Sequence, residues 1–332
     1  MKVDKQKMPS ITRNDLNIIP YLDLEKLGNR KVFSLTFYDE GEWHLWYPTP
    51  DGLAKMYAIP VESTYFAKCP ERENDIFLHF IDFIVQRASW KEIVKPFHGL
   101  QEDIYNLSAS LKKFKILYEY SQNIGDGVSR LVITEIEYLF SVCRSIYDLL
   151  QEIISSLWDK FDFFDPKLKK KPLPKTFRKV VFHKNRLCSE EQIIQRFGMP
   201  DSLAKFYIRN QDFFTILRKF RDNILHRGST FKLIFVTERG FAVKSNLEPF
   251  CGFNIWNDEH RLKNDLCSLR PALAYLIHNT LSACEDFSQT IESIIEFPPP
   301  LVPEMKYYMR GYFNDELVQN EIVLKDCLWW DN

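Results

Sequence analysis

One short stretch of the sequence combines side chains that can do acid–base chemistry on a negatively charged substrate. Arg221 and His226 are separated by four residues, and Asp222 directly follows the arginine. An imidazole both accepts and donates a proton near neutral pH, and a guanidinium stabilises negative charge. On a helix, the i,i+4 spacing brings Asp222 close to His226, where a carboxylate orients the imidazole and favours its charged form. These three residues are therefore candidate catalytic residues.

The helix that must position them is predicted from about residue 202 to residue 227. Its core face carries Phe213, Leu217, Phe220 and Ile224. Because a helix turns by about 100° per residue, Asp222 and His226 face away from that core and Arg221 lies at its border. Phe214 and Arg218 belong to a mixed apolar and cationic flank outside the core, which suits contact with a second subunit.

The string from Arg221 to Gly228 resembles the motif of the HEPN superfamily of α-helical domains, over a region from about Leu100 to Phe297. The resemblance implies an endoribonuclease that forms a homodimer with both motifs in a shared cleft. It also implies a reaction without metal or cofactor, giving 2′,3′-cyclic phosphate ends. His226 would act as general base on a ribose 2′-OH or as general acid to the leaving 5′-oxygen. Arg221 would hold the scissile phosphate, and Asp222 would position the histidine.

The same string has simpler interpretations. Gly228 is a good helix stop, and the cationic residues His226 and Arg227 complement the dipole of the last turn. One alternative is therefore a catalytically inactive HEPN-like module that binds RNA or a partner protein. A second is a purely structural helical interaction protein, and a third is that the motif is a target for nucleotide modification by a partner enzyme.

Residues 160–186 form a strongly basic segment, with ten Lys and Arg against Asp162 and Asp165, an excess of eight positive charges. Neutralisation of phosphates combined with stacking of bases on aromatic rings, here Phe177 and Phe182, is a common way to hold single-stranded RNA. The alternative is a loop that its lysines merely keep solvated. The predicted RNA-binding residues are Lys169, Lys170, Lys171, Lys175, Arg178 and Lys179 in this segment, and Arg218 and Arg227 on the motif helix.

Polar residues also occur on the preceding long helix, at Glu135, Glu137, Arg144 and Asp148. HEPN domains often carry a polar residue on an early helix near the cleft, a role open to Arg144 or Asp148, whereas the simpler interpretation is a solvated helix face. The histidines and cysteines share no metal-ligand spacing, so no metal site is expected.

The predicted fold is mainly α: a HEPN-like helical bundle with β-hairpin insertions and a small α+β N-terminal extension. Five helices are expected from apolar spacing, at about 74–84, 100–118, 132–157, 202–227 and 268–297. The clearest of these helices is 132–157. Its apolar residues recur at steps of three and four: Val132, Ile136, Leu139, Cys143, Ile146, Leu150, Ile153 and Leu157.

Three domains are predicted. Residues 1–73 form the extension, whose β-hairpin spans about 31–47 and is followed by a segment that prolines at 48, 50 and 60 keep irregular. Residues 74–297 form the bundle, with the basic loop 160–186 and a second hairpin at 231–243. Residues 298–332 form an aromatic tail docked on the bundle.

Composition limits the compartment and the partners. Seven scattered cysteines without a C-x-x-C pair are typical of a reducing cytoplasm, and neither a signal peptide nor a membrane span is expected. The net charge of −1 means that a nucleic acid must be bound by a local patch. The expected location is cytoplasmic. The expected partners are RNA, a second copy of the chain and, from the family's toxin and antiviral-defence roles, an antitoxin or regulatory protein.

Overall fold

The computed structural model describes residues 11–227, 233–326 and 328–330, and it does not describe the side chains of residues 223–227 and 259. Contacts divide the chain into two compact units. The sheet unit comprises residues 1–94 and 297–312, and the helical unit comprises residues 95–296 and 313–332. The predicted domain ranges 1–73, 74–297 and 298–332 stay a prediction, because grouping by contacts does not test them as folding units.

The prediction of a mainly α helical bundle is wrong. Helix accounts for 51% of the structure and strand for 16%, and six strands form one mixed sheet, so the chain is an α+β protein. The sheet was missed because it joins strands from opposite ends of the sequence. Pairing between distant segments leaves no local periodicity to read.

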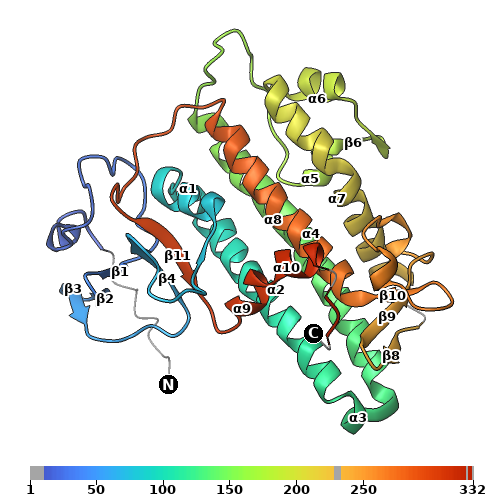
Figure 1. Cartoon of the computed structure of the whole chain (residues 1–332). Coiled ribbons are helices and arrows are strands. Elements are labelled where there is room, and N and C mark those ends of the chain that lie inside the picture. The colour runs from blue at the N-terminus through green and yellow to red at the C-terminus, as the bar shows by residue number, and fades with distance from the viewer. Residues whose placement is uncertain (1–10, 228–232, 327, 331–332) are drawn as a thin grey trace, which may run out of the picture. The chain divides into compact units, whose positions relative to one another are not determined.

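The sheet unit is built on six strands. These are β1 (Thr36–Asp39), β2 (Glu42–Thr49), β3 (Gly52–Met56), β4 (Ser63–Ala67), β5 (Ile76–Phe77) and β11 (Lys306–Arg310), in the order β3-β2-β1-β4-β11-β5. β1 and β4 are parallel, and the other neighbours are antiparallel. Figure 1 shows β11, drawn in red, beside the blue β4.

Two local predictions for this unit are corrected, and one is confirmed. The first hairpin is confirmed, because β1 pairs with β2. Pro48 does not end the pairing, since it lies within β2 opposite Leu53 of β3. Asn74 does not begin a helix, because Ile76 and Phe77 pair with β11 and α1 (His79–Arg87) begins later. The short helices η1 (Asp15–Ile18) and η2 (Lys91–Ile93) complete the unit.

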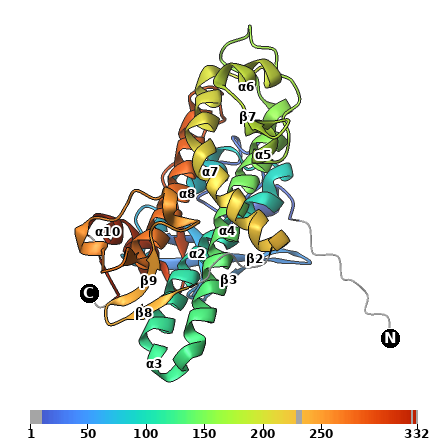
Figure 2. The same ribbon diagram turned by 90° about the vertical axis from the view of Figure 1, so that its right-hand side faces the viewer.

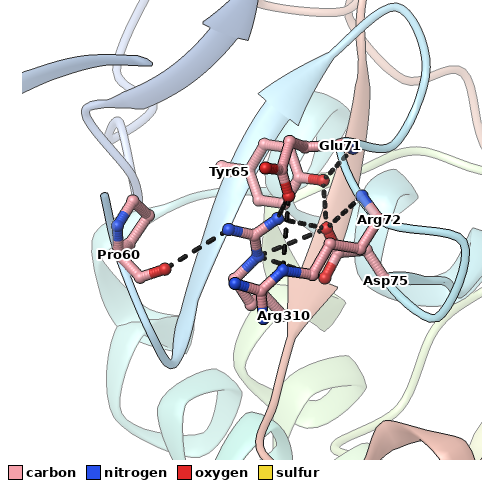
Figure 3. Close-up of polar contacts among 6 residues, drawn as sticks. All are labelled: Pro60, Tyr65, Glu71, Arg72, Asp75 and Arg310. Atoms are coloured by element: carbon pink, nitrogen blue, oxygen red, sulfur yellow. Dashed lines mark hydrogen bonds and ion pairs between the residues drawn. The ribbon is translucent and has the colours of Figure 1, made fainter. Parts of the chain in front are cut away.

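A fully buried arginine holds β11 in this sheet (Figure 3). The Arg310 guanidinium donates to Asp75 at 2.8 Å and also pairs with Glu71. The Asp75 carboxylate accepts a further hydrogen bond of 2.7 Å from the Tyr65 hydroxyl. Arg310 also lies over the Trp43 ring, 4.7 Å from its centroid. All three nitrogens of the buried guanidinium and both oxygens of Asp75 therefore have partners, as burial of charge requires.

The helical unit contains four long helices, α2 (Val94–Glu119), α4 (Val128–Leu157), α7 (Asp201–Arg227) and α8 (Leu269–Glu292). α4, α7 and α8 contact one another, and Figure 2 shows them side by side. All eight residues of the predicted α4 seam are buried, so that prediction is confirmed. The shorter helices are α3 (Ser121–Ile124), η3 (Gly125–Gly127), η4 (Trp158–Lys160), α5 (Phe177–Val181), α6 (Glu190–Phe197), η5 (Phe250–Gly252), η6 (Asp258–His260), α9 (Asn314–Val318) and α10 (Asn320–Lys325).

The helical unit also contains two small sheets among its described residues. They are β6 (Phe182–His183) paired with β7 (Arg186–Leu187), and β9 (Gly240–Lys244) between β8 (Phe235–Thr237) and β10 (Leu266–Ser268). The second predicted hairpin is confirmed where the structure describes it, since β8 pairs with β9; residues 228–232 lie outside the described chain. In the C-terminal segment, Trp329 is fully buried and its carbonyl accepts from Arg270. None of the described helices is both long and apolar enough to cross a membrane.

Candidate nucleic-acid interface

The C-terminal half of α7 carries the predicted motif. Its core face is as predicted, but the flank that contains Phe214 is not. Leu217 and Phe220 are buried, as predicted for the core face. Phe214 was expected outside the core, on a flank for a second subunit, but it is completely buried. Phe177 of α5 covers it, with the two ring centroids 4.7 Å apart. Part of that flank is therefore occupied by the chain itself.

The motif's acidic residue already has a partner on α7. Asp222 pairs with Arg218, one turn before it, at 3.2 Å. Arg221 is exposed and forms no ion pair or hydrogen bond with another described residue. His226 and Arg227 belong to α7 by their backbone, but their side chains lie outside the described ones. The predicted contact between Asp222 and His226 therefore stays a prediction, and its carboxylate is engaged by Arg218.

A second arginine–aspartate pair with the same i,i+4 spacing lies on α4. Arg144 is only 7% exposed, and its Nη1 lies 2.6 Å from an Asp148 oxygen. The Arg144 guanidinium lies over the Phe214 ring, 4.2 Å from the centroid, and Arg218 lies in the same way over Phe182, at 4.9 Å. The solvated-face interpretation of Arg144 is therefore wrong, because the buried Phe214 of α7 packs against its guanidinium.

Arg144 contacts α7 at Phe214, one turn before Arg218, and the charges of both helices act on its pKa. Burial lowers the pKa of the Arg144 guanidinium, and the charge of Arg221 lowers this pKa further. Asp148 and Asp222 act in the opposite direction. The contacts that the structure gives are two separate ion pairs, Arg144 with Asp148 on α4 and Arg218 with Asp222 on α7.

The basic segment 160–186, named here the basic strap, is fastened along one face of α4. Asp148, Gln151, Ser155 and Trp158 follow each other at steps of three and four residues, so they line a single stripe from α4 into η4. Each of these side chains forms a hydrogen bond with a backbone group of the strap. Asp148 Oδ1 accepts from Phe177 N at 3.1 Å, and Gln151 donates to Pro174 O at 2.7 Å. Ser155 donates to Leu173 O and Trp158 donates to Lys171 O, both at 2.9 Å. The strap is therefore packed on the helix and is not a free solvated loop.

The predicted RNA-binding residues of the strap divide into two groups. Lys170 is half-buried and donates to the Trp158 carbonyl at 2.8 Å, and Lys171 donates to Gln195 O at 2.7 Å near the end of α6. These two lysines satisfy helix-end carbonyls of the chain itself. The other four, Lys169, Lys175, Arg178 and Lys179, are exposed, as is Lys171, and Arg178 donates to Asn185 at 3.0 Å.

The aromatic residues expected to stack on bases are differently placed. Phe177 is 1% exposed and belongs to the core, and the Phe182 ring is covered by Arg218. The large exposed aromatic of the strap is Phe164, at 59%, next to the buried Phe163. No feature of the sequence separates these two adjacent phenylalanines, so sequence reasoning could not have selected Phe164.

The C-terminal end of the strap contacts α7 and carries several exposed cations. α5 lies beside α7 in both ribbon views (Figures 1 and 2), and the contact of Arg218 with Phe182 joins β6 to α7. The exposed cationic or titratable residues next to this junction are Arg178, Lys179, His183, Lys184 and Arg186. Such a surface suits a polyanion. Among the described residues, no three His, Cys, Asp or Glu side chains gather as metal ligands.

Comparison with protein-family models gives no match, and neither curated proteins nor solved structures contain a match to this chain.

Proposed function

We propose that this chain is a metal-independent endoribonuclease of HEPN type, which holds single-stranded RNA on the basic strap and α7. The observation that supports this is the contact of Arg218 with Phe182, which holds the C-terminal end of the strap on α7 one helical turn before Arg221. Phosphate groups of a bound strand would follow the exposed cations of the strap toward the motif. The resemblance of the motif supports the reaction itself.

In the proposed reaction, His226 removes the proton of a ribose 2′-OH or protonates the leaving 5′-oxygen. The 2′-oxygen attacks phosphorus, the bond to the 5′-oxygen breaks, and a 2′,3′-cyclic phosphate remains. Arg221 stabilises the negative charge that develops on the phosphate oxygens. By the same resemblance, two copies of the chain form the cleft, in the cytoplasm, in a toxin or antiviral-defence role with an antitoxin or regulatory partner.

A second candidate function is RNA binding without cleavage. The ion pair between Asp222 and Arg218 favours it, because a carboxylate held at 3.2 Å by an arginine is less able to orient a histidine. In this alternative the cationic surface binds the strand and the motif serves as part of that surface.

The proposal is tested by cleavage of a panel of single-stranded and structured RNAs in EDTA. Wild type is compared with His226→Ala and Arg221→Ala. We expect both variants to lose roughly 10²-fold or more of the rate, since each removes a group that acts on the reacting atoms. The wild-type products should end in 2′,3′-cyclic phosphate.

Arg209→Ala is the matched control, because Arg209 also lies on α7 but pairs with Asp286 of α8, at 2.5 Å. Its cleavage rate should equal that of wild type. Binding without cleavage by wild type would support the second candidate. Equal background in all four proteins, without binding, would reject both.

A further inference from the structure

The sheet unit contains a pocket of about 540 Å³, formed by residues 11–16 and 27–35. Small-molecule sites have volumes of about 300–1,000 Å³, so the pocket can hold a small organic ligand. Five of the lining residues are aliphatic: Ile11, Leu16, Leu27, Val32 and Leu35. Three are cationic: Arg13, Arg30 and Lys31. No acidic or aromatic residue of the described chain lines this pocket, which therefore combines an aliphatic wall with positive charge.

Arg30 is the fixed cation of the pocket, because it is only 4% exposed and backbone carbonyls hold its guanidinium. Nη1 donates to Gln86 O at 2.6 Å and to Pro299 O at 2.8 Å. Nη2 donates to Lys26 O, so three of the five N–H donors are used. Nε has no hydrogen bond to a described residue, and it is not one of the fully buried atoms without a partner. It therefore keeps accessible surface, and Arg30 can still donate to a ligand.

The described chain supplies little negative charge to offset these cations. Burial and the charge of Arg87 lower the pKa of Arg30 to about 10. Asp23 raises this pKa only in part, and it is itself paired with a lysine at 2.7 Å. Asp15 is also engaged, because it accepts a hydrogen bond of 2.6 Å from Thr12 N. An anion bound in the pocket would supply the missing negative charge.

The aliphatic wall selects the body of the anion. Nucleobases are commonly held by stacking on aromatic rings, and no described aromatic residue lines this pocket. An alkyl chain gains from burial against aliphatic side chains, and a carboxylate matches the geometry of a guanidinium. We infer that the pocket binds an aliphatic carboxylate, whose chain lies on the aliphatic wall and whose carboxylate pairs with Arg30, Arg13 and Lys31. This site belongs to the sheet unit and does not depend on the proposed binding of RNA.

The test is isothermal titration of the full chain with octanoate below its micelle concentration. We expect saturable binding of one octanoate, about tenfold weaker binding of hexanoate, and roughly tenfold or more weaker binding of octanol, which lacks the charge. Octanol equal to octanoate would overturn the role of the cations, and acetate equal to octanoate would overturn the role of the wall. No saturable binding of octanoate would overturn the proposal, also if the protein sediments with phosphatidylglycerol vesicles.

Variants of the lining residues locate the binding. Lys31 is exposed, and Lys31→Met should weaken octanoate binding about fivefold. Lys55→Met is the control and should match wild type, because Lys55 is also exposed in the sheet unit but does not line the pocket. Val32→Trp should abolish binding by filling the pocket, and Arg30→Met should weaken it more than Lys31→Met does. If Arg30→Met does not fold, the other two variants decide the matter. Lys31→Met and Val32→Trp both equal to wild type would overturn this pocket as the site.

Discussion

Two buried arginines of this protein differ in how completely their donors are used. Arg310 pairs with Asp75 and Glu71 and also donates to Pro60 O at 3.4 Å (Figure 3). Arg144 has one carboxylate beside it, and its Nε has no hydrogen-bond partner among the described residues. The chain gives all three nitrogens of the Arg310 guanidinium a partner, whereas it satisfies those of Arg144 only in part.

Arg310→Met should strongly destabilise the sheet unit. The Asp75 side chain is 1% exposed, and removing its cation leaves a buried negative charge, which costs about 3–5 kcal/mol. Urea unfolding followed by tryptophan fluorescence measures the loss. Arg72→Met is the control, because Arg72 is half-exposed and its pair with Glu71 contributes about 1 kcal/mol or less. Equal losses in the two variants would contradict a special role for Arg310.

At the residue scale, the sequence predicted the core face of α7 correctly, but it did not predict the burial of Phe214 on α7 and Arg144 on α4. The spacing of Leu217 and Phe220 correctly gave the core face, because helical periodicity is a local property. The burial of Arg144 and Phe214 was not predictable in this way. Both are covered by segments that are distant in sequence, and a single helical period cannot report a second buried face.

At the element scale, the long helices were predictable and the sheet was not. The seam of α4 continues for eight residues at steps of three and four, which is a strong local signal. β5 has only two residues, and β11 is separated from β4 by more than half of the chain. Neither length nor alternation identifies such strands. The basic strap was recognised as cationic, but its attachment to α4 depends on side chains that looked like a solvated face.

Gly198→Ala should detach the strap from the end of α6. Gly198 has φ +61°, and a Cβ built there would lie 1.9 Å from the Lys169 carbonyl oxygen. Left-handed backbone costs an alanine about 1–2 kcal/mol, and the clash adds to that cost. Limited trypsin digestion should therefore cut the strap lysines faster in this variant than in wild type, with the cut sites identified by mass spectrometry.

Gly28→Ala is the matched control for that digestion. Its φ of +54° is also positive, but no atom lies within 4 Å of the added Cβ. It should therefore leave the rate of cleavage in the strap unchanged. Equal acceleration in both variants would contradict a specific role for the contact between residue 198 and Lys169, because Gly28 belongs to the sheet unit.

At the scale of the whole molecule, the proposed cleft requires two copies of the chain. Size-exclusion chromatography with light scattering should give twice the 39.5 kDa of one chain at concentrations that cleave RNA. The physical reason is that each motif alone supplies one histidine, while the proposed cleft uses both motifs. A monomer mass under conditions of full activity would contradict the dimeric cleft without contradicting RNA binding by the strap.

The place of β11 in the sheet also constrains how the protein is made. β11 lies between β4 and β5, although more than 200 residues separate it from both in the sequence. During synthesis on the ribosome, the edge of β4 that pairs with β11 stays unpaired until residue 310 has emerged. The helical segments from 95 to 296 are complete before then. The N-terminal part of this protein is thus synthesised first and finished last, which gives chaperones an exposed strand edge to protect during translation.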